Sequence, residues 1–150
     1  MSVRYLLLIE DDMVSLPKIQ EKLALSKLEV TSLYLAKNLV DAISVLKGNV
    51  IDVILLALDL DNDKSVYHLR AIRSYTDSPI IVLSNNENEL LAIDALREGA
   101  NEFLVKSRTS PEELRRVILC VVNRHEIRKT TKKMDEKLSL LCNLNAASGC

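Results

Sequence analysis

Acidic side chains, one hydroxyl and one lysine follow apolar runs of the sequence, and their types suit chemistry on a phosphoryl group. In chain order these residues are Glu10, Asp11, Asp12, Asp59, Asp61, Ser84 and Lys106. Carboxylate oxygens with one cation suit Mg²⁺ and a phosphoryl group better than they suit zinc or a hydride cofactor. The sequence contains no glycine-rich phosphate loop. Any chemistry is therefore expected to depend on acids and a lysine that the fold brings together.

Short apolar runs alternate along the chain with amphipathic stretches, and this alternation predicts the elements that position those residues. The predicted strands cover residues 5–9, 29–34, 51–56, 79–83 and 102–105. The predicted helices cover residues 15–25, 38–48, 66–75, 90–98 and 111–143. Continuous apolar runs are typical of strands buried on both faces. Five successive strand–helix units favour a right-handed, doubly wound parallel sheet, with functional groups beyond the carboxyl ends of its strands.

Capping signals mark the ends of several predicted helices. Ser15 and Asn38 stand where a side-chain oxygen could cap the first and second helices. Ser110 precedes a proline and could cap the last helix. Gly48 and Gly99 stand where the second and fourth helices should stop, and we expect a left-handed conformation at Gly48.

Length, composition and charge narrow the class of protein. The chain has 150 residues, of which 48% are hydrophobic and 27% charged, and these values favour one folded domain over disorder. A formal net charge of -1 makes nucleic-acid binding an unfavoured reading. Three cysteines without metal-ligand spacing indicate reduced thiols. Neither a signal peptide nor a membrane-length apolar run is recognised, so we expect no membrane contact and a cytoplasmic location.

At this level of detail, residues 4–122 resemble the receiver domain of two-component response regulators in both spacing and residue type. The resemblance implies a flavodoxin-like five-stranded α/β fold, (βα)5, here with an extended C-terminal helix. It also implies a role in signal transduction or a phosphorelay, with a histidine kinase or a downstream effector domain as the partner.

Carried over residue by residue, the resemblance assigns a role to most of the polar residues at the strand ends. It implies that Glu10 and Asp11 are the metal-binding acid pair. Ser84 and Phe103 match the switch hydroxyl and the switch aromatic of the family. Lys106 matches the lysine that pairs with the phosphate, and without a phosphate we expect its ammonium to take a carboxylate of the acid pair.

The family's phosphoacceptor aspartate is missing, because the residue after the third apolar run is Ala57. A methyl group cannot form an acyl phosphate. One carboxylate of the metal site is lost with it, so Mg²⁺ binding is expected to be weak or vestigial. Asp61, Ser65 and Ser107 also depart from the glycine and prolines usual in the family, which favours natural drift. We therefore expect a degenerate pseudo-receiver that is neither phosphorylated nor an enzyme.

Two other interpretations remain open at this stage. Asp59 or Asp61 could act as a surrogate acceptor and take a phosphoryl group from a small phosphodonor, although the resemblance gives Asp59 only a backbone carbonyl ligand to the metal. Alternatively, the space left beside Ala57 could serve a small-ligand or metal-binding module. An acid-labile phosphoryl group would favour the first interpretation, and calorimetric Mg²⁺ binding the second.

The last predicted helix continues past the expected end of the domain, because no Gly or Pro interrupts residues 112–143. A heptad pattern follows it; its positions are Cys120, Arg124, Ile127, Thr131, Met134, Leu138 and Leu141. We expect residues 1–122 to form the receiver-like domain and residues 123–150 a coiled-coil linker that dimerises and frays after Asn143. Receivers with such helices resemble N-terminal modules of larger signalling proteins.

Overall fold

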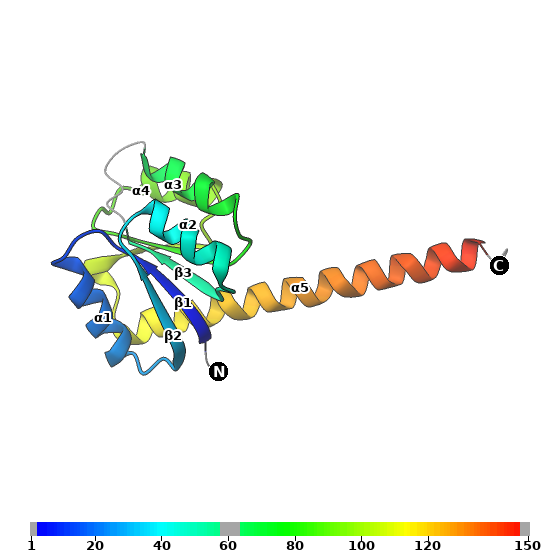
Figure 1. The fold of residues 1–150 in the computed structure, drawn as a ribbon, viewed down its shortest axis with the longest axis horizontal. Helices are drawn as coiled ribbons and strands as arrows, with labels where there is room; N and C mark the ends of the chain where they lie inside the picture. The colour runs from blue at the N-terminus through cyan, green and yellow to red at the C-terminus, as the bar shows by residue number, and fades with distance from the viewer. Residues whose placement is uncertain (1–2, 58–63, 148–150) are drawn as a thin grey trace.

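The computed structural model describes residues 3–57 and 64–147, which form a parallel sheet covered by helices on both faces (Figure 1). The strands are β1 (Val3–Ile9), β2 (Val30–Ala36), β3 (Val53–Leu56), β4 (Ile80–Ser84) and β5 (Glu102–Val105). The helices are α1 (Ser15–Leu25), α2 (Leu39–Gly48), α3 (Lys64–Arg73), α4 (Glu89–Arg97) and α5 (Pro111–Ala147), and a short 3₁₀ helix, η1 (Lys106–Arg108), follows β5. No strand bound differs from the predicted one by more than two residues.

The strand order is β2-β1-β3-β4-β5, and all neighbouring strands are parallel. This order confirms the doubly wound fold predicted from the sequence. The register aligns Ile9 of β1 with Leu56 of β3, and Leu56 with Val82 of β4. Consequently the polar residues that follow β1, β3, β4 and β5 lie along one edge of the sheet.

Two apolar layers separate the sheet from its helices. On one face, residues of α2, α3 and α4 such as Ala42, Ile72 and Ala95 pack against the sheet. On the other face, α1 and α5 pack against alternate residues of the same strands, with Ile19 and Ile118 in that cluster. The central strand β3 is fully buried, as its unbroken apolar run predicts.

The helix ends show which capping signals are reliable. The Asn38 side chain accepts a hydrogen bond from the Asp41 N–H at 2.8 Å, and the Ser110 Oγ accepts one from the Glu113 N–H at 3.1 Å, so both predicted caps are confirmed. The cap predicted at Ser15 is wrong, because Ser15 is already in the first turn of α1. The carboxylate of Asp12 takes that place one turn earlier.

The two glycines behave differently. Gly99 has φ +108°, a left-handed conformation that glycine adopts without steric cost, and it follows the end of α4 as predicted. The left-handed stop predicted at Gly48 is wrong, because α2 is followed by Asn49 in an extended conformation. The Asn49 side chain donates to the Val45 carbonyl at 3.0 Å, which satisfies a carbonyl at the helix end without a left-handed residue.

Helix α5 lies on the sheet in its first part and then projects far beyond the domain (Figure 1). Val121 is still buried, whereas the Ile127 side chain is 57% exposed. The helix continues to Ala147, past the fraying point expected near Asn143, because alanines at the end of the run favour helix and no glycine precedes Gly149. No helix within the described residues, α5 included, is long and apolar enough to span a bilayer.

The half-buried guanidinium of Arg73 joins the ends of α3 and α4 to the start of β4. It donates to the Gly99 carbonyl from Nε at 3.0 Å and from Nη2 at 2.7 Å, and to the Ser78 carbonyl at 2.6 Å. Its Nη2 also donates to the Asn101 side-chain oxygen, which accepts a further bond from the Ile80 N–H. A single side chain therefore satisfies carbonyls from two separate loops.

Arg73→Ala is expected to lower the free energy of unfolding by about 2–4 kcal/mol, because partly buried acceptors lose their donor. Arg70→Ala is a matched control on the same helix, since the Arg70–Glu98 ion pair at 2.7 Å is exposed on the arginine side. It should cost less than about 1 kcal/mol. Urea unfolding followed by far-UV circular dichroism measures both variants, and equal losses would contradict the role of Arg73.

Candidate functional site

Glu10 and Lys106 form a nearly buried ion pair at the carboxyl edge of the sheet. Glu10 follows β1 and Lys106 follows β5, and the Lys106 Nζ lies 2.9 Å from the Glu10 Oε2. The two side chains are 1% and 13% exposed, respectively. The predicted ion pair between the lysine and the acid pair is thus present, and Glu10 is the partner. Because β5 and β1 are separated by β3 and β4, the lysine reaches across the ends of both.

Ala57 lies directly under this ion pair. It is completely buried, and its backbone N–H donates to the Ile9 carbonyl at 2.8 Å, which continues the pairing of β3 with β1. The Ala57 carbonyl accepts a second hydrogen bond from the Lys106 Nζ at 3.2 Å. The lysine therefore contacts the backbone at position 57, although that residue has no carboxylate to offer.

The remaining acids of the triplet differ in how their oxygens are used. The second oxygen of Glu10 accepts the Asp12 N–H at 3.0 Å. Asp12 accepts the Val14 N–H at 2.8 Å and the Ser15 hydroxyl at 3.1 Å, and these two hydrogen bonds lower the pKa of the Asp12 carboxyl. Asp11 is exposed and makes no hydrogen bond or ion pair with any described residue.

A cavity of about 240 Å³ opens at this edge of the sheet, and its lining includes the acidic triplet, Asn85 and Lys106. Its donor set does not fit a magnesium site well. Both oxygens of Glu10 and both of Asp12 already accept hydrogen bonds from the protein, which leaves Asp11 as the unengaged carboxylate. Among the described residues, no cluster of three or more His, Cys, Asp or Glu could hold a metal ion.

The two residues assigned to a switch lie further along the edge. Ser84 ends β4, is 2% exposed, and its Oγ accepts the Asn86 N–H at 3.0 Å. Phe103 on β5 is half-buried and packs against the cluster under α2, α3 and α4. Asp59 and Asp61, the candidate surrogate acceptors, lie outside the described residues.

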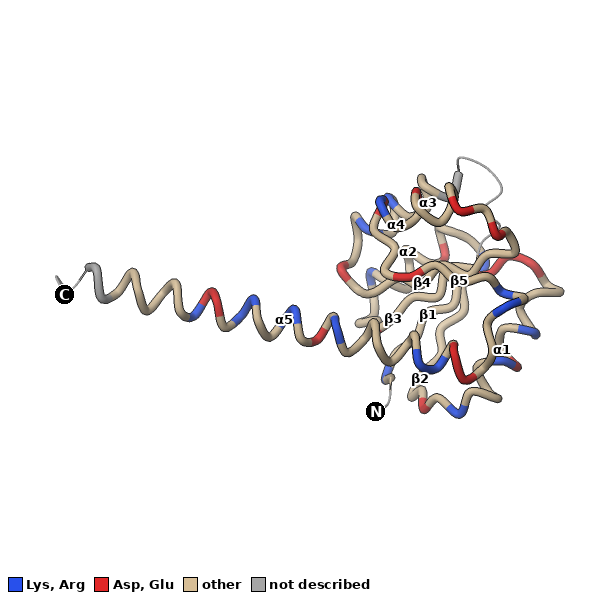
Figure 2. The backbone as a smooth tube through the Cα atoms, turned by 180° about the vertical axis from the view of Figure 1, so that it is seen from behind, with Lys and Arg blue, Asp and Glu red and all other residues tan. Residues whose placement is uncertain are grey.

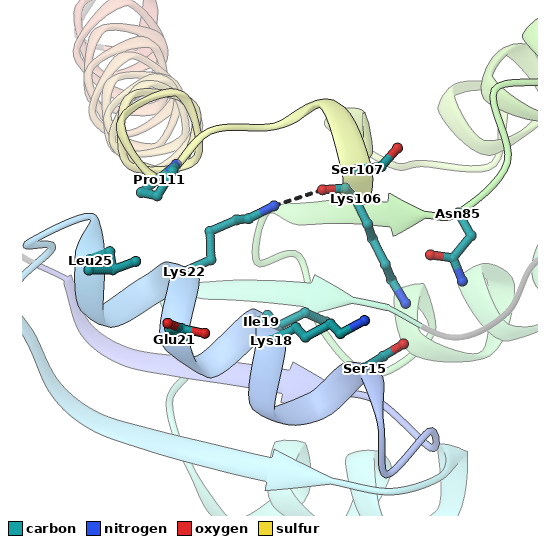
Figure 3. Close-up of a pocket in the computed structure, with 10 residues that line it drawn as sticks. All are labelled: Ser15, Lys18, Ile19, Glu21, Lys22, Leu25, Asn85, Lys106, Ser107 and Pro111. Carbon is teal, nitrogen blue, oxygen red and sulfur yellow. Dashed lines mark hydrogen bonds between the residues drawn. The ribbon is translucent and has the colours of Figure 1, made fainter.

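Lys22 is a residue of this region that the sequence did not single out. It projects from α1, and its Nζ donates to the backbone carbonyl of Lys106 at 2.7 Å (Figure 3). The two lysines are 84 positions apart in sequence, so no local pattern could have paired them. Through this bond, α1 contacts the residue that holds Glu10.

The expected dimer residues are placed together on the projecting part of α5. Ile127, Met134, Leu138 and Leu141 are between 56% and 59% exposed. The structure adds Leu140 and Leu144, each 62% exposed, which the heptad spacing alone did not include. Figure 2 shows that charged residues occupy the part of the helix nearer the domain, and the sequence has none after Lys137.

Two curated proteins illustrate the relatives of this chain. The transcriptional regulatory protein KdpE of Staphylococcus aureus is 35% identical over 124 residues, covering 81% of this chain and 52% of that protein. The two-component response regulator-like protein APRR1 of Arabidopsis thaliana is 30% identical over 112 residues, covering 73% of this chain and 18% of that protein. The chain therefore spans about half, or less, of the length of these relatives.

Solved structures and a family model agree with this relationship. The receiver domain of a response regulator from Clostridium thermocellum superposes with a TM-score of 0.67 at 26% identity, over 83% of this chain and 98% of that one. The receiver domain of NarL from Mycobacterium tuberculosis, at 23% identity, shares the fold with a TM-score of 0.67, over 81% and 97% of the two chains. The model of the response regulator receiver domain matches residues 6–119. The chain belongs to the family of response regulator receiver domains.

Proposed function

We propose that this receiver domain works without phosphorylation, as a pseudo-receiver that signals through contacts with other proteins. The observation that carries the proposal is Ala57, a buried methyl group beneath the Lys106 ammonium. The ammonium is already neutralised by Glu10, so the site is electrically satisfied in the absence of a phosphoryl group.

The protein-internal ion pair supports a fixed state of the site. A buried lysine with a carboxylate at 2.9 Å and a carbonyl at 3.2 Å gains little from a mobile anion. Ser84 supports the same conclusion, because its hydroxyl already accepts the Asn86 N–H in a turn after β4. On this proposal Ser84 and Phe103 keep structural roles, and Glu10 and Asp11 are remnants of a metal site.

We further propose that the domain is a regulatory module whose output belongs to another domain or protein. The relatives that it matches are longer regulatory proteins, of which the chain covers at most about half. A histidine kinase or a downstream effector is the class of partner expected for a receiver. The boundary between the domain and its helical extension lies near residues 121–124, where α5 loses contact with the sheet.

The extension of α5 is proposed as a homodimerisation element. From Arg124 to Ala147 it extends about 35 Å at 1.5 Å per residue. Exposed apolar side chains lie along this length, and an isolated helix cannot bury them. A two-helix coiled coil would cover them, with modest affinity because Arg124 and Thr131 interrupt the heptad positions.

Incubation with acetyl phosphate and Mg²⁺ should add no phosphoryl group to the chain, because an alanine cannot form an acyl phosphate. Intact-mass spectrometry measures this directly. Ala57→Asp should gain an acid-labile phosphoryl group, whereas Ala57→Asn, of similar size, should not. A stoichiometric phosphoprotein from the unaltered chain would contradict the proposal, and Asp59→Asn and Asp61→Asn would then identify the acceptor.

Mg²⁺ should bind weakly, because Asp11 alone of the acidic triplet has unengaged carboxylate oxygens. Ala57→Asp adds an anionic ligand and should strengthen binding roughly tenfold, about 1.4 kcal/mol. Isothermal titration calorimetry measures both affinities, with Ala57→Asn as the variant that adds no charge. If Ala57→Asp leaves the affinity unchanged, position 57 does not face the acid pair.

The ion pair should contribute to folding. Lys106→Met and Glu10→Gln are each expected to lower the free energy of unfolding by about 2–4 kcal/mol, because each leaves a buried polar group without its partner. The double variant should lose clearly less than the sum, with a coupling of about 1–3 kcal/mol. Urea unfolding at neutral pH measures the cycle, and Lys18→Met provides an exposed control. Additive losses would contradict a direct interaction.

Sedimentation of the chain at on the order of tens of micromolar should show a dimer, whereas a version ending at Arg124 should be monomeric. Leu138→Glu should also produce a monomer, because it places a charge in the apolar stripe. Ser139→Glu introduces the same charge at the neighbouring position and should leave the dimer intact. A monomeric full chain would exclude α5 as a dimerisation element in this range.

A further inference from the structure

A second cavity lies on the side of the sheet covered by α1 and α5, beside the acid site. It has a volume of about 460 Å³ and is bounded by α1 and by the segment that connects β5 to α5. Lys106 and Asn85 line both cavities, so the two sites share a wall. A volume of this size is typical of pockets that bind small molecules.

The two ends of this cavity differ in polarity. Figure 3 shows Leu25 and Pro111 near one end, and Ser15, Lys18 and the Lys106 ammonium near the other. Ile19 and Lys22 of α1 lie between the two ends. The cavity therefore offers an apolar surface at one end and hydrogen-bond donors with positive charge at the other.

The positive charge of the cavity is not neutralised by the protein. Lys106 is paired with Glu10, but neither Lys18 nor Lys22 lies within ion-pair distance of a carboxylate in the part of the chain that is described. Lys22 uses one of its three ammonium donors on the Lys106 carbonyl at 2.7 Å and keeps two. Glu21 also lines the cavity, so the two unpaired lysines outweigh it by one charge.

We propose that this cavity binds a small amphipathic anion. Its carboxylate, sulfonate or phosphate group would be held by Lys18 and Lys22, and its apolar body would lie on Ile19, Leu25 and Pro111. The charge-assisted hydrogen bonds fix the head group, and burial of the apolar body supplies affinity. This inference goes beyond the proposed loss of phosphorylation, because the two concern different cavities.

Binding in this cavity reaches the acid site through Lys106. The backbone carbonyl of Lys106 accepts from Lys22, while the side chain of the same residue holds Glu10 and the Ala57 carbonyl. An anion that engages Lys22 therefore acts on the residue that positions the ion pair. The domain gains an input that does not depend on a phosphoacceptor.

The test uses anilinonaphthalene sulfonate, an amphipathic aromatic anion, and phenylnaphthylamine, a neutral analogue that lacks the sulfonate. Amide chemical shifts of the full chain, measured by heteronuclear NMR, should change in residues 15–25 and 106–112 when the sulfonate is added. Lys18→Gln and Lys22→Gln should each weaken its binding roughly fivefold to tenfold. Lys132→Gln, on the projecting part of α5, is the control and should leave the affinity unchanged.

The variants and the neutral probe keep the outcome decisive. Lys18 makes no contact that folding needs, so Lys18→Gln remains interpretable even if Lys22→Gln disturbs the Lys106 carbonyl. Leu25→Glu should also weaken binding by placing a carboxylate at the apolar end. Shifts confined to residues 127–144, equal binding of the neutral probe, or no shifts at millimolar sulfonate would each overturn the proposal. Tighter binding of an acidic peptide would overturn it too, in favour of a protein-docking surface. None of these outcomes depends on whether the chain accepts a phosphoryl group.

Discussion

The ion pair between Lys106 and Glu10 joins three strands of the sheet at their carboxyl ends. Lys106 follows β5, Glu10 follows β1, and the Ala57 carbonyl that completes the lysine's contacts follows β3. A buried ion pair is stable only when both charges are well hydrogen-bonded. Glu10 meets this condition, because its second oxygen accepts the Asp12 N–H and its first accepts the lysine. The acid site is therefore a closed arrangement with little unused hydrogen-bonding capacity.

The closed arrangement follows from where the alanine stands. Ala57 belongs to the apolar cluster beneath α1 and α5, and its burial is complete. A carboxylate at this position would compete with Glu10 for the same ammonium. With a methyl group instead, the lysine has one carboxylate partner and a backbone carbonyl. Loss of the acceptor and stabilisation of the lysine are thus two consequences of a single residue.

Local signals in the sequence predict most of the fold but few of its long-range contacts. The strands and the caps at Asn38 and Ser110 depend on residues within a few positions of one another, and these predictions are confirmed. The cap at Ser15 was mispredicted because an acid three residues earlier competes for the same turn. The hydrogen bond from Lys22 to Lys106 and the contacts of Arg73 join loops that only the folded chain brings together. The Lys106–Glu10 pair was predictable because the family resemblance placed both residues at one edge.

Helix α5 connects this edge to the far end of the molecule. It begins three residues after η1, whose first residue is Lys106, and its first part is fixed to the sheet by Leu114, Ile118 and Val121. Buried contacts of this kind resist small displacements, so a shift at the start of the helix is carried along it as a rigid body. The projecting part then extends past the opposite edge of the sheet, near the start of β1 (Figure 1). A change in the contacts of Lys106, whether by Glu10 or by Lys22, is therefore applied at the base of the same helix whose distal apolar side chains await a partner.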